Sequence, residues 1–138
     1  MKKHWYFDKF FEKYKDKIGS YPFFWTNDKK EKRKKIWKKQ REKYGFDERE
    51  TWNLDYTFII WVYERFSMYK DIGSEVVDLE YHKFTVEGKE YTQLELINII
   101  LQLCEFLIKN DDSWKEEYHG VYKELLNLFS VVMPAMWW

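Results

Sequence analysis

The segment ETWNLDYTFIIWVYERF, residues 50–66, restricts the fold more than any other part of the sequence, because most of its side chains are aromatic or aliphatic. At helical spacing the side chains fall on two faces: Trp52, Asp55, Tyr56, Ile59, Tyr63 and Phe66 on one, and Leu54, Phe58, Trp61, Val62, Arg65 and Tyr69 on the other. A helix that is apolar nearly all round lies at the centre of a domain. We therefore predict a buried central helix, preceded by Asp47 and Glu50 at capping-box spacing and ending near Gly73.

Four further helices are predicted from apolar spacing and from the residues that start and stop them. They cover residues 4–18, residues 28–45, a segment that begins at the T-x-x-E capping box of Thr92 and Glu95, and a segment from the Ser113–Glu116 capping box to Pro134. The helix at 28–45 has only Ile36, Trp37 and Tyr44 as large apolar side chains, so it is predicted to lie on the surface. The helix after Thr92 is marked by the apolar stripe Leu94, Ile97, Leu101, Cys104 and Ile108.

The predicted fold is mainly α, a compact bundle of about five helices. The chain has 138 residues, enough for one hydrophobic core, and only 2 Pro and 5 Gly, which favours long helices over strands and turns. The sequence FTVEGKEYT alternates around Glu87 and Gly88, which predicts a short β-hairpin or an ordered loop near residues 82–92.

Charge divides the chain into two parts, although the formal net charge is zero. Residues 28–43 carry ten basic and three acidic side chains, whereas residues 46–138 carry eight basic and eighteen acidic ones. We therefore describe residues 1–138 as a single helical domain with a basic, aromatic N-terminal part, 1–45, and an acidic core, 46–138.

The expected location is the cytoplasm, with no membrane partner. The single cysteine, Cys104, excludes an intramolecular disulfide framework and a Cys-rich zinc site, and its apolar neighbours favour the role of a small hydrophobe. Asp8 and Lys9 interrupt the apolar stretch at the N-terminus, so no signal peptide is expected. The apolar stretch at residues 56–63, only eight residues before Glu64 and Arg65, is too short to cross a membrane.

Three segments together resemble a family of small tailed-phage proteins of unassigned function: GFDERETWNLDYTFIIWVYERF at 45–66, ELINIILQLCEFLI at 95–108 and LLNLFSVVMPAMWW at 125–138. That family has a D-T-W-x-M/L-D-x-T-L stretch, then an amphipathic helix, then a chain end rich in LWW or LWD. The residues that fit the first stretch are Thr51, Trp52, Leu54, Asp55 and Thr57, whereas Glu50 stands where Asp is usual. The resemblance covers roughly the last two thirds of the chain. It implies a phage origin and the cytoplasm of an infected bacterial host, and it supplies no catalytic residues.

Asp55 and Arg65 are the charged side chains that stand out on the central helix. They are ten residues apart, roughly 15 Å along a helix axis, so a direct contact is excluded and each needs a partner on another helix or in a ligand. A buried carboxylate needs hydrogen-bond donors, so Asp55 is interpreted as a structural tie to a helix N-terminus or an indole N–H. A ligand contact is its alternative role, and general-base chemistry ranks last. Arg65 is the first candidate for ligand binding, and the set around it is Trp52, Tyr56, Trp61 and Tyr69.

The basic run of the second helix is another candidate site. Its members are Lys34, Lys35, Trp37, Lys38, Lys39 and Arg41. Such a run is usually a solvated helix face. Basic side chains interleaved with Trp37 and Tyr44 also suit phosphate backbones, through counterion release and stacking on bases. An anionic nucleotide, an acidic protein surface or the acidic core of this chain, in the same or another subunit, would suit the run equally.

No catalytic constellation is recognisable, so the chain is predicted not to be an enzyme and to use no cofactor. The sequence contains no P-loop, G-x-G-x-x-G, G-x-S-x-G or H-E-x-x-H motif. Glu116 and His119 form one E-x-x-H pair, but a di-iron bundle needs two such pairs and two further carboxylates, so no metal site is predicted. Cys104 lies within an apolar helix, which disfavours a reactive thiol.

The chain ends in AMWW, two adjacent indoles shortly after Pro134. Two such rings are costly to leave in water. They are expected to pack into the core, with a subunit or partner interface as the alternative.

Two functions remain open. The leading hypothesis is a phage accessory protein that sequesters a small anionic, nucleotide-like ligand and so antagonises host defence. The alternative is a macromolecular binder, an inhibitor or phage assembly partner, that acts through residues 29–43 and exposed aromatics; as its partner, a host protein ranks above nucleic acid. Both predict a homo-oligomer. An enclosed concavity at Arg65 would favour the first function, and an accessible basic helix the second.

Overall fold

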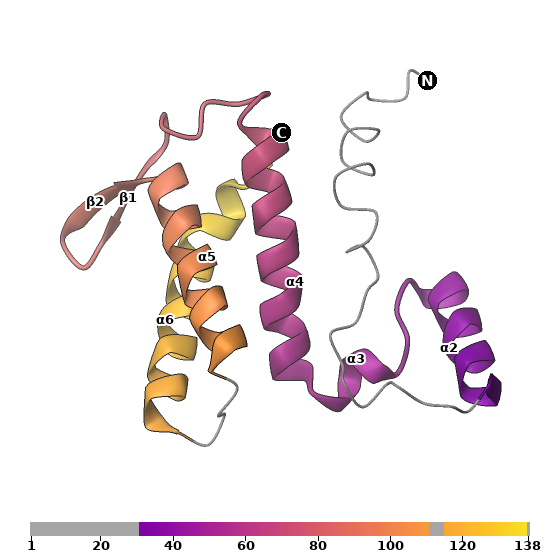
Figure 1. Cartoon of the computed structure of the whole chain (residues 1–138). Helices are drawn as coiled ribbons and strands as arrows, with labels where there is room; N and C mark the ends of the chain where they lie inside the picture. The colour runs from indigo at the N-terminus through magenta and orange to yellow at the C-terminus, as the bar shows by residue number, and fades with distance from the viewer. Residues whose placement is uncertain (1–30, 111–114, 138) are drawn as a thin grey trace.

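The computed structural model describes residues 31–110 and 115–137 (Figure 1). The helix predicted at 4–18, the proposed cap Ser113 and the last residue, Trp138, lie outside this part of the chain. The elements in chain order are α2 (Glu31–Tyr44), α3 (Arg49–Trp52), α4 (Leu54–Met68), a π-helical turn (Tyr69–Gly73), β1 (Lys83–Val86), β2 (Lys89–Thr92), α5 (Gln93–Lys109), α6 (Glu116–Val132) and a 3-10 turn (Met133–Ala135). The prediction of a mainly helical fold with a short hairpin is confirmed.

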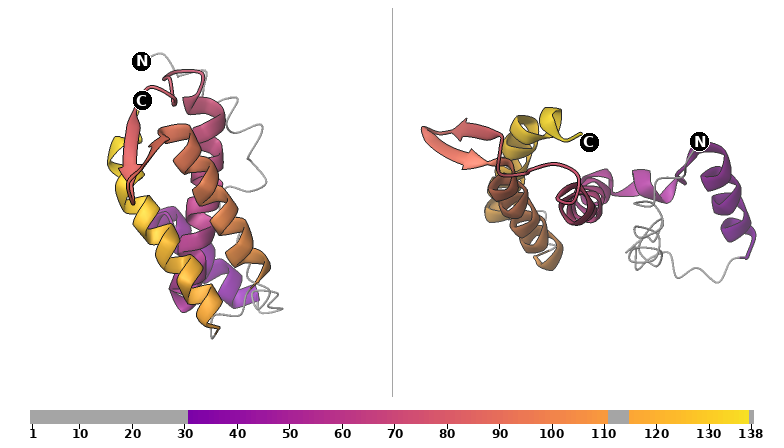
Figure 2. Two further views of the ribbon diagram at one scale, coloured as in Figure 1. Left: turned by 90° about the vertical axis from the view of Figure 1, so that its left-hand side faces the viewer. Right: turned by 90° about the horizontal axis from the view of Figure 1, so that it is seen from above.

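Helices α4, α5 and α6 form the core, with α5 packed against both of the others. The buried side chains are Ile59, Val62 and Phe66 of α4, Leu96, Ile97, Ile100, Cys104 and Leu107 of α5, and Tyr118, Leu125, Leu128 and Val132 of α6. Of the apolar stripe that predicted α5, Ile97 and Cys104 are fully buried, and Leu94, Leu101 and Ile108 are half-buried against the core. Figure 2 shows α3 and α2 beyond α4, on the side away from α5 and α6, and the hairpin on the opposite side of the bundle.

The central helix is shorter than predicted. Asn53 has φ −128° and ψ 75°, outside the helical region, and it separates the single turn of α3 from α4. The capping box predicted at Asp47 is also wrong: Glu48 precedes α3 without a side-chain cap, and the Asp47 carboxylate binds Arg49 instead. At its other end α4 passes into the π-helical turn, which extends to Gly73 as expected.

The capping box before α5 is confirmed. The Glu95 backbone N–H donates to Thr92 Oγ1 at 3.1 Å, and the Thr92 N–H donates to Glu95 Oε1 at 3.2 Å. These two bonds satisfy backbone donors that the first turn of a helix leaves without partners. By contrast, α6 begins at Glu116 after Lys115, which makes no side-chain cap.

The hairpin is antiparallel and pairs Phe84 with Tyr91. Its two turn residues, Glu87 with φ 51° and Gly88 with φ 78°, both have positive φ, as a type I′ turn requires. Phe84, Val86 and Tyr91 pack against the core, so the hairpin is held by the bundle and does not stand alone.

Two glycine substitutions are expected to have opposite effects. Gly88→Ala should lower the free energy of unfolding by about 1 kcal/mol, because a Cβ is strained at φ 78° even though nothing lies within 4 Å. Gly120→Ala should raise it by about 0.5 kcal/mol, because Gly120 lies within α6 with open space around it and alanine is the better helix former. Urea denaturation of both variants measures the difference, and equal shifts would contradict the turn assignment.

Candidate functional site: a basic helix and an apolar groove

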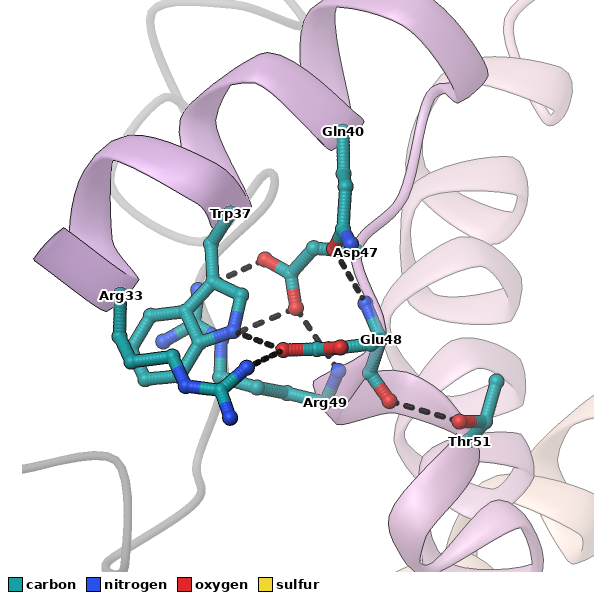
Figure 3. Close-up of polar contacts among 7 residues, drawn as sticks. All are labelled: Arg33, Trp37, Gln40, Asp47, Glu48, Arg49 and Thr51. Atoms are coloured by element: carbon teal, nitrogen blue, oxygen red, sulfur yellow. Dashed lines mark hydrogen bonds and ion pairs between the residues drawn. The ribbon is translucent and has the colours of Figure 1, made fainter.

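Trp37 fixes the position of the basic helix α2 (Figure 3). Its side chain is only 3% exposed, and its indole Nε1–H donates to Glu48 Oε1 at 2.8 Å. The Arg49 guanidinium lies over its ring, 4.2 Å from the centroid, and Trp52 meets the ring edge-on at 6.2 Å. The ring contacts and the hydrogen bond together hold α2 against α3 and the loop before it.

A buried ion pair supports this arrangement. Arg49 donates to the two carboxylate oxygens of Asp47 from Nε at 2.9 Å and from Nη2 at 2.8 Å, and its backbone N–H donates to Oδ1 at 3.0 Å. The two side chains are 0% and 11% exposed, Asp47 being the fully buried one. Glu48 adds a second link, because it accepts from Arg33 Nη1 at 3.0 Å and its N–H donates to Gln40 Oε1 at 2.9 Å.

The predicted basic surface is present, and of its two rings Tyr44 is exposed whereas Trp37 is not. Helix α2 carries eight basic and two acidic residues, and Lys34, Lys35, Lys38 and Lys39 are exposed. Trp37 is buried, so the prediction that it interleaves with the lysines as a stacking ring is wrong. A cleft of about 510 Å³ is formed by α2 together with Arg49 of α3. Its lining residues are Lys34, Trp37, Lys38, Arg41, Glu42 and Arg49. Most of the charged side chains in its wall are therefore positive.

A groove of about 680 Å³ runs between α4 and α6. Its lining residues are Leu54, Asp55, Thr57, Phe58, Trp61, Tyr122, Leu126 and Phe129. Phe58 is the central ring, stacked on Trp61 at 6.5 Å and edge-on to Phe129 at 5.3 Å. Leu54 is 65% exposed at one end of the groove. Single apolar side chains scattered over a protein surface are common, whereas here six rings and leucines line one groove.

The groove begins next to the basic helix. Trp52 contacts Trp37 of α2, and Leu54, two residues further along the chain, lines the groove. Trp52 itself is about half exposed. The basic cleft and the apolar groove are therefore joined through the short helix α3.

Asp55 is exposed, so the prediction that its carboxylate is buried is wrong. A structural tie does exist at this residue, but through its main chain: Tyr122 Oη donates to the Asp55 carbonyl oxygen at 2.9 Å and links α6 to α4. Burial, and next the Asp55 charge, raise the pKa of Tyr122 to about 12, so this phenol stays protonated as a donor.

Arg65 is exposed and finds its partner on its own helix, contrary to expectation. Its guanidinium lies over the ring of Trp61, one turn earlier, at 5.0 Å from the centroid. Arg65 and Trp61 are thus brought together, but Trp52 precedes α4 and Tyr69 follows its last residue, so they lie at opposite ends of the helix. Tyr56 is half-buried between them. Among the described residues, Trp61 lines the groove between α4 and α6, whereas Tyr69 lines a different cavity beyond the end of α4.

The chain end only partly packs into the core. Met136 contacts the core, whereas Trp137 is 73% exposed and accepts a hydrogen bond from Tyr69 Oη on its carbonyl oxygen at 3.4 Å. The prediction of a core position is therefore wrong for Trp137.

Within residues 31–110 and 115–137, no cluster of three or more His, Cys, Asp or Glu side chains could hold a metal ion. His119 lies edge-on to Tyr118, with ring centroids 6.2 Å apart. None of the helices described in this part of the chain is both long and apolar enough to span a bilayer.

Cys104 is expected to be unreactive in the folded protein. It is fully buried, and burial, with a smaller effect of Glu105, raises the pKa of its thiol from 9.0 to about 12. Since the thiolate is the nucleophile, labelling by a disulfide reagent near neutral pH should follow unfolding. Because the folded state favours the neutral thiol, the contribution of Cys104 to the free energy of unfolding is complete below pH 9. It declines as the pH rises towards 12. Rapid labelling without denaturant would contradict this, and Leu54→Cys serves as an exposed control.

Comparison with known proteins gives no relative: no family model, curated protein or solved structure matches the chain. The sequence resemblance to small tailed-phage proteins therefore stays a prediction.

Proposed function

We propose that this chain is a non-enzymatic binding protein that holds a protein partner in the groove between α4 and α6. The observation that carries the proposal is the groove itself, about 680 Å³ in volume and lined mainly by rings and leucines. Phe58, Trp61 and Leu126 would supply the buried apolar contacts on which a protein interface depends.

The groove suits a protein segment better than a small anion. Among the described residues that line it, the one charged side chain is Asp55, which would repel an anionic group. Arg65 stacks on Trp61, which places the nearest cation of α4 at the edge of the apolar surface.

The basic helix defines the charge of the partner. Lys35, Lys38 and Lys39 are exposed on α2 and make no ion pair with any described residue, while Trp52 and Leu54 connect α2 to the groove. A partner with an apolar stretch flanked by acidic residues would match both surfaces. Complementary charge of this kind increases the rate of association and selects among partners.

Cross-linking tests the proposal. A photoreactive phenylalanine analogue replaces Leu126, which is exposed in the groove, in bacterial cells treated with nuclease after illumination. We expect a protein adduct that is formed at Leu126 and is weakened by the triple change Lys35→Glu, Lys38→Glu, Lys39→Glu. The control places the same analogue at Lys109, an exposed residue at the end of α5.

Three outcomes would overturn the proposal. Equal adducts at Leu126 and Lys109 would indicate non-specific capture. An adduct that nuclease removes would indicate nucleic acid. An adduct of twice the chain's own mass would assign the groove to a second copy of the chain, which is the homo-oligomer that the sequence predicted.

A small anionic ligand is the second candidate, and a different cleft favours it. This cleft of about 620 Å³ lies between the hairpin and α6, and its lining includes Lys89, Tyr91, Lys123 and Asn127. Two lysines, a ring and an amide are the groups that a nucleotide-like anion needs, although Glu87 and Glu124 also line the cleft. The phage origin and the antagonism of host defence that the sequence suggested are part of this second proposal.

Thermal-shift measurements with cyclic and linear nucleotides test the second candidate. A rise in melting temperature that the double change Lys89→Glu, Lys123→Glu removes would support it. The absence of any shift in the unchanged protein would reject it.

A further inference from the structure

A separate cavity lies where the π-helical turn, the loop before the hairpin, the start of α5 and the C-terminal segment meet. Its volume is about 240 Å³. The lining residues that matter for its chemistry are Tyr69, Asp78, Tyr81, His82, Gln93 and Trp137. None of the residues that line the groove between α4 and α6 lines this cavity.

Aromatic rings form much of the cavity wall. Tyr81 is 76% exposed and Trp137 is 73% exposed, so both rings stand at its opening. Tyr69 is half-buried, and its hydroxyl is held by two weak hydrogen bonds, one donated to the Trp137 carbonyl oxygen at 3.4 Å and one accepted from Gln93 Nε2 at 3.5 Å. Faces of such rings attract cations.

Two polar groups of the cavity can accept a hydrogen bond from a ligand, the Asp78 carboxylate and the Gln93 amide oxygen. Asp78 is the acidic residue among the described ones that line the cavity, and Oδ1 of its carboxylate accepts a hydrogen bond from the Glu80 N–H at 2.9 Å. Gln93 is only 2% exposed, and its amide nitrogen is occupied by Tyr69 Oη and by the Ala135 carbonyl oxygen. Its amide oxygen receives no hydrogen bond from the described residues, so it is left to accept one from a ligand in the cavity that Gln93 lines.

The cavity offers an anion little. No lysine or arginine of residues 31–110 and 115–137 lines it. The first N–H groups of α5 are already used: that of Gln93 donates to the His82 carbonyl oxygen at 3.1 Å, and that of Leu94 donates to the Leu79 carbonyl oxygen at 2.9 Å. The N–H groups of these two residues are therefore not available to an anion at the N-terminus of α5.

We propose that this cavity binds an alkylammonium group, with the rings of Tyr69, Tyr81 and Trp137 around the cation and with Asp78 and the Gln93 amide oxygen as acceptors for its N–H groups. Rings combined with a carboxylate suit an organic cation, and the volume suits one amine head group with a short chain. A free amine and a lysine side chain share this chemistry.

Titration of the full chain with n-butylammonium chloride, followed by NMR, tests the proposal. We expect saturable shifts of the Trp137 indole and Gln93 amide signals. Asp78→Asn should weaken binding roughly fivefold through loss of the charge, and Tyr81→Ala roughly threefold through loss of one ring. Glu117→Gln, which removes an exposed carboxylate in the first turn of α6 and outside the cavity, is the control and should leave the affinity unchanged.

The ligand series makes the proposal falsifiable without any variant. Tetramethylammonium, which has no N–H, should bind more weakly than n-butylammonium, and butyrate should not bind. Shifts that sodium chloride reproduces at equal ionic strength, or equal binding of butyrate, would overturn the proposal, as would an unchanged affinity in Asp78→Asn. Tighter binding of 1,4-diaminobutane than of N-acetyl-lysine methylamide would indicate a free amine as the ligand, and the reverse order a lysine side chain.

Discussion

The substitution Asp47→Ala is expected to release α2 from α3. The free energy needed to separate the two helices should fall by about 3 kcal/mol. The fully buried Asp47 carboxylate accepts three hydrogen bonds from Arg49, two of them charge-assisted. Without it, the guanidinium over Trp37 loses these acceptors while it remains mostly buried. Amide hydrogen exchange measures the effect: protection should fall in α2 and stay unchanged in α5.

Glu90→Ala is the matched control for Asp47→Ala. Glu90 also forms an ion pair, with Lys83 at 3.4 Å, but both side chains are more than half exposed. A pair of this kind contributes little, so the change in stability should stay within about 0.5 kcal/mol. Unchanged protection of α2 in Asp47→Ala would show that the buried pair does not hold this helix.

The same variant also bears on the proposed function. Asp47→Ala removes no basic residue from α2, yet it should misplace all eight of them relative to the groove. If the charge of α2 has to lie beside the groove, the adduct at Leu126 should weaken in Asp47→Ala as it does in the charge-reversed variant. Unchanged cross-linking would mean that the partner binds the groove without any contribution from the charge of α2.

Local signals in the sequence were sufficient for several elements. The capping box of Thr92 and Glu95 and the turn at Glu87–Gly88 are each formed by neighbouring residues, so their spacing alone identified them. The break at Asn53 was missed because no Gly or Pro marks it.

Pairing between distant residues could not be predicted in the same way. Trp37 and Arg49 are separated by the end of α2 and a loop, and a single sequence does not show that a guanidinium of α3 will cover that ring. Trp37 was therefore assigned to the basic surface, and Asp47 to a capping box. Both residues instead build the contact that positions the surface.

The central helix shows why the apolar pattern misled the prediction of burial. Apolar residues on all faces of residues 50–66 predicted a fully covered helix, but among the described elements only one face of α4 packs against α5. The other face, with Leu54 and Phe58, borders the groove. The excess of apolar side chains was therefore a signal for a binding surface as much as for a core, and it left Asp55 exposed.

Phe66→Ala is expected to lower the free energy of unfolding of the whole bundle by about 4 kcal/mol, because the ring is 2% exposed and its removal leaves a cavity in the core. Phe66→Leu, which keeps most of the volume, should cost about 1 kcal/mol, and Val76→Ala, in an exposed loop, about 0.5 kcal/mol or less. Urea denaturation followed by circular dichroism gives all three values.

The effect of Phe66→Ala should also reach the groove, because Phe129 stacks on Phe66 at 5.8 Å on one side and meets Phe58 edge-on at 5.3 Å on the other. When Phe66 is removed, Phe129 can move into the cavity, and the groove then loses part of its wall. Cross-linking at Leu126 should therefore fall more in Phe66→Ala than in Ile100→Ala, a core change of α5 that leaves both of these ring contacts in place. Equal losses in the two variants would show that the groove depends on overall stability and not on the contact that Phe129 makes with Phe58.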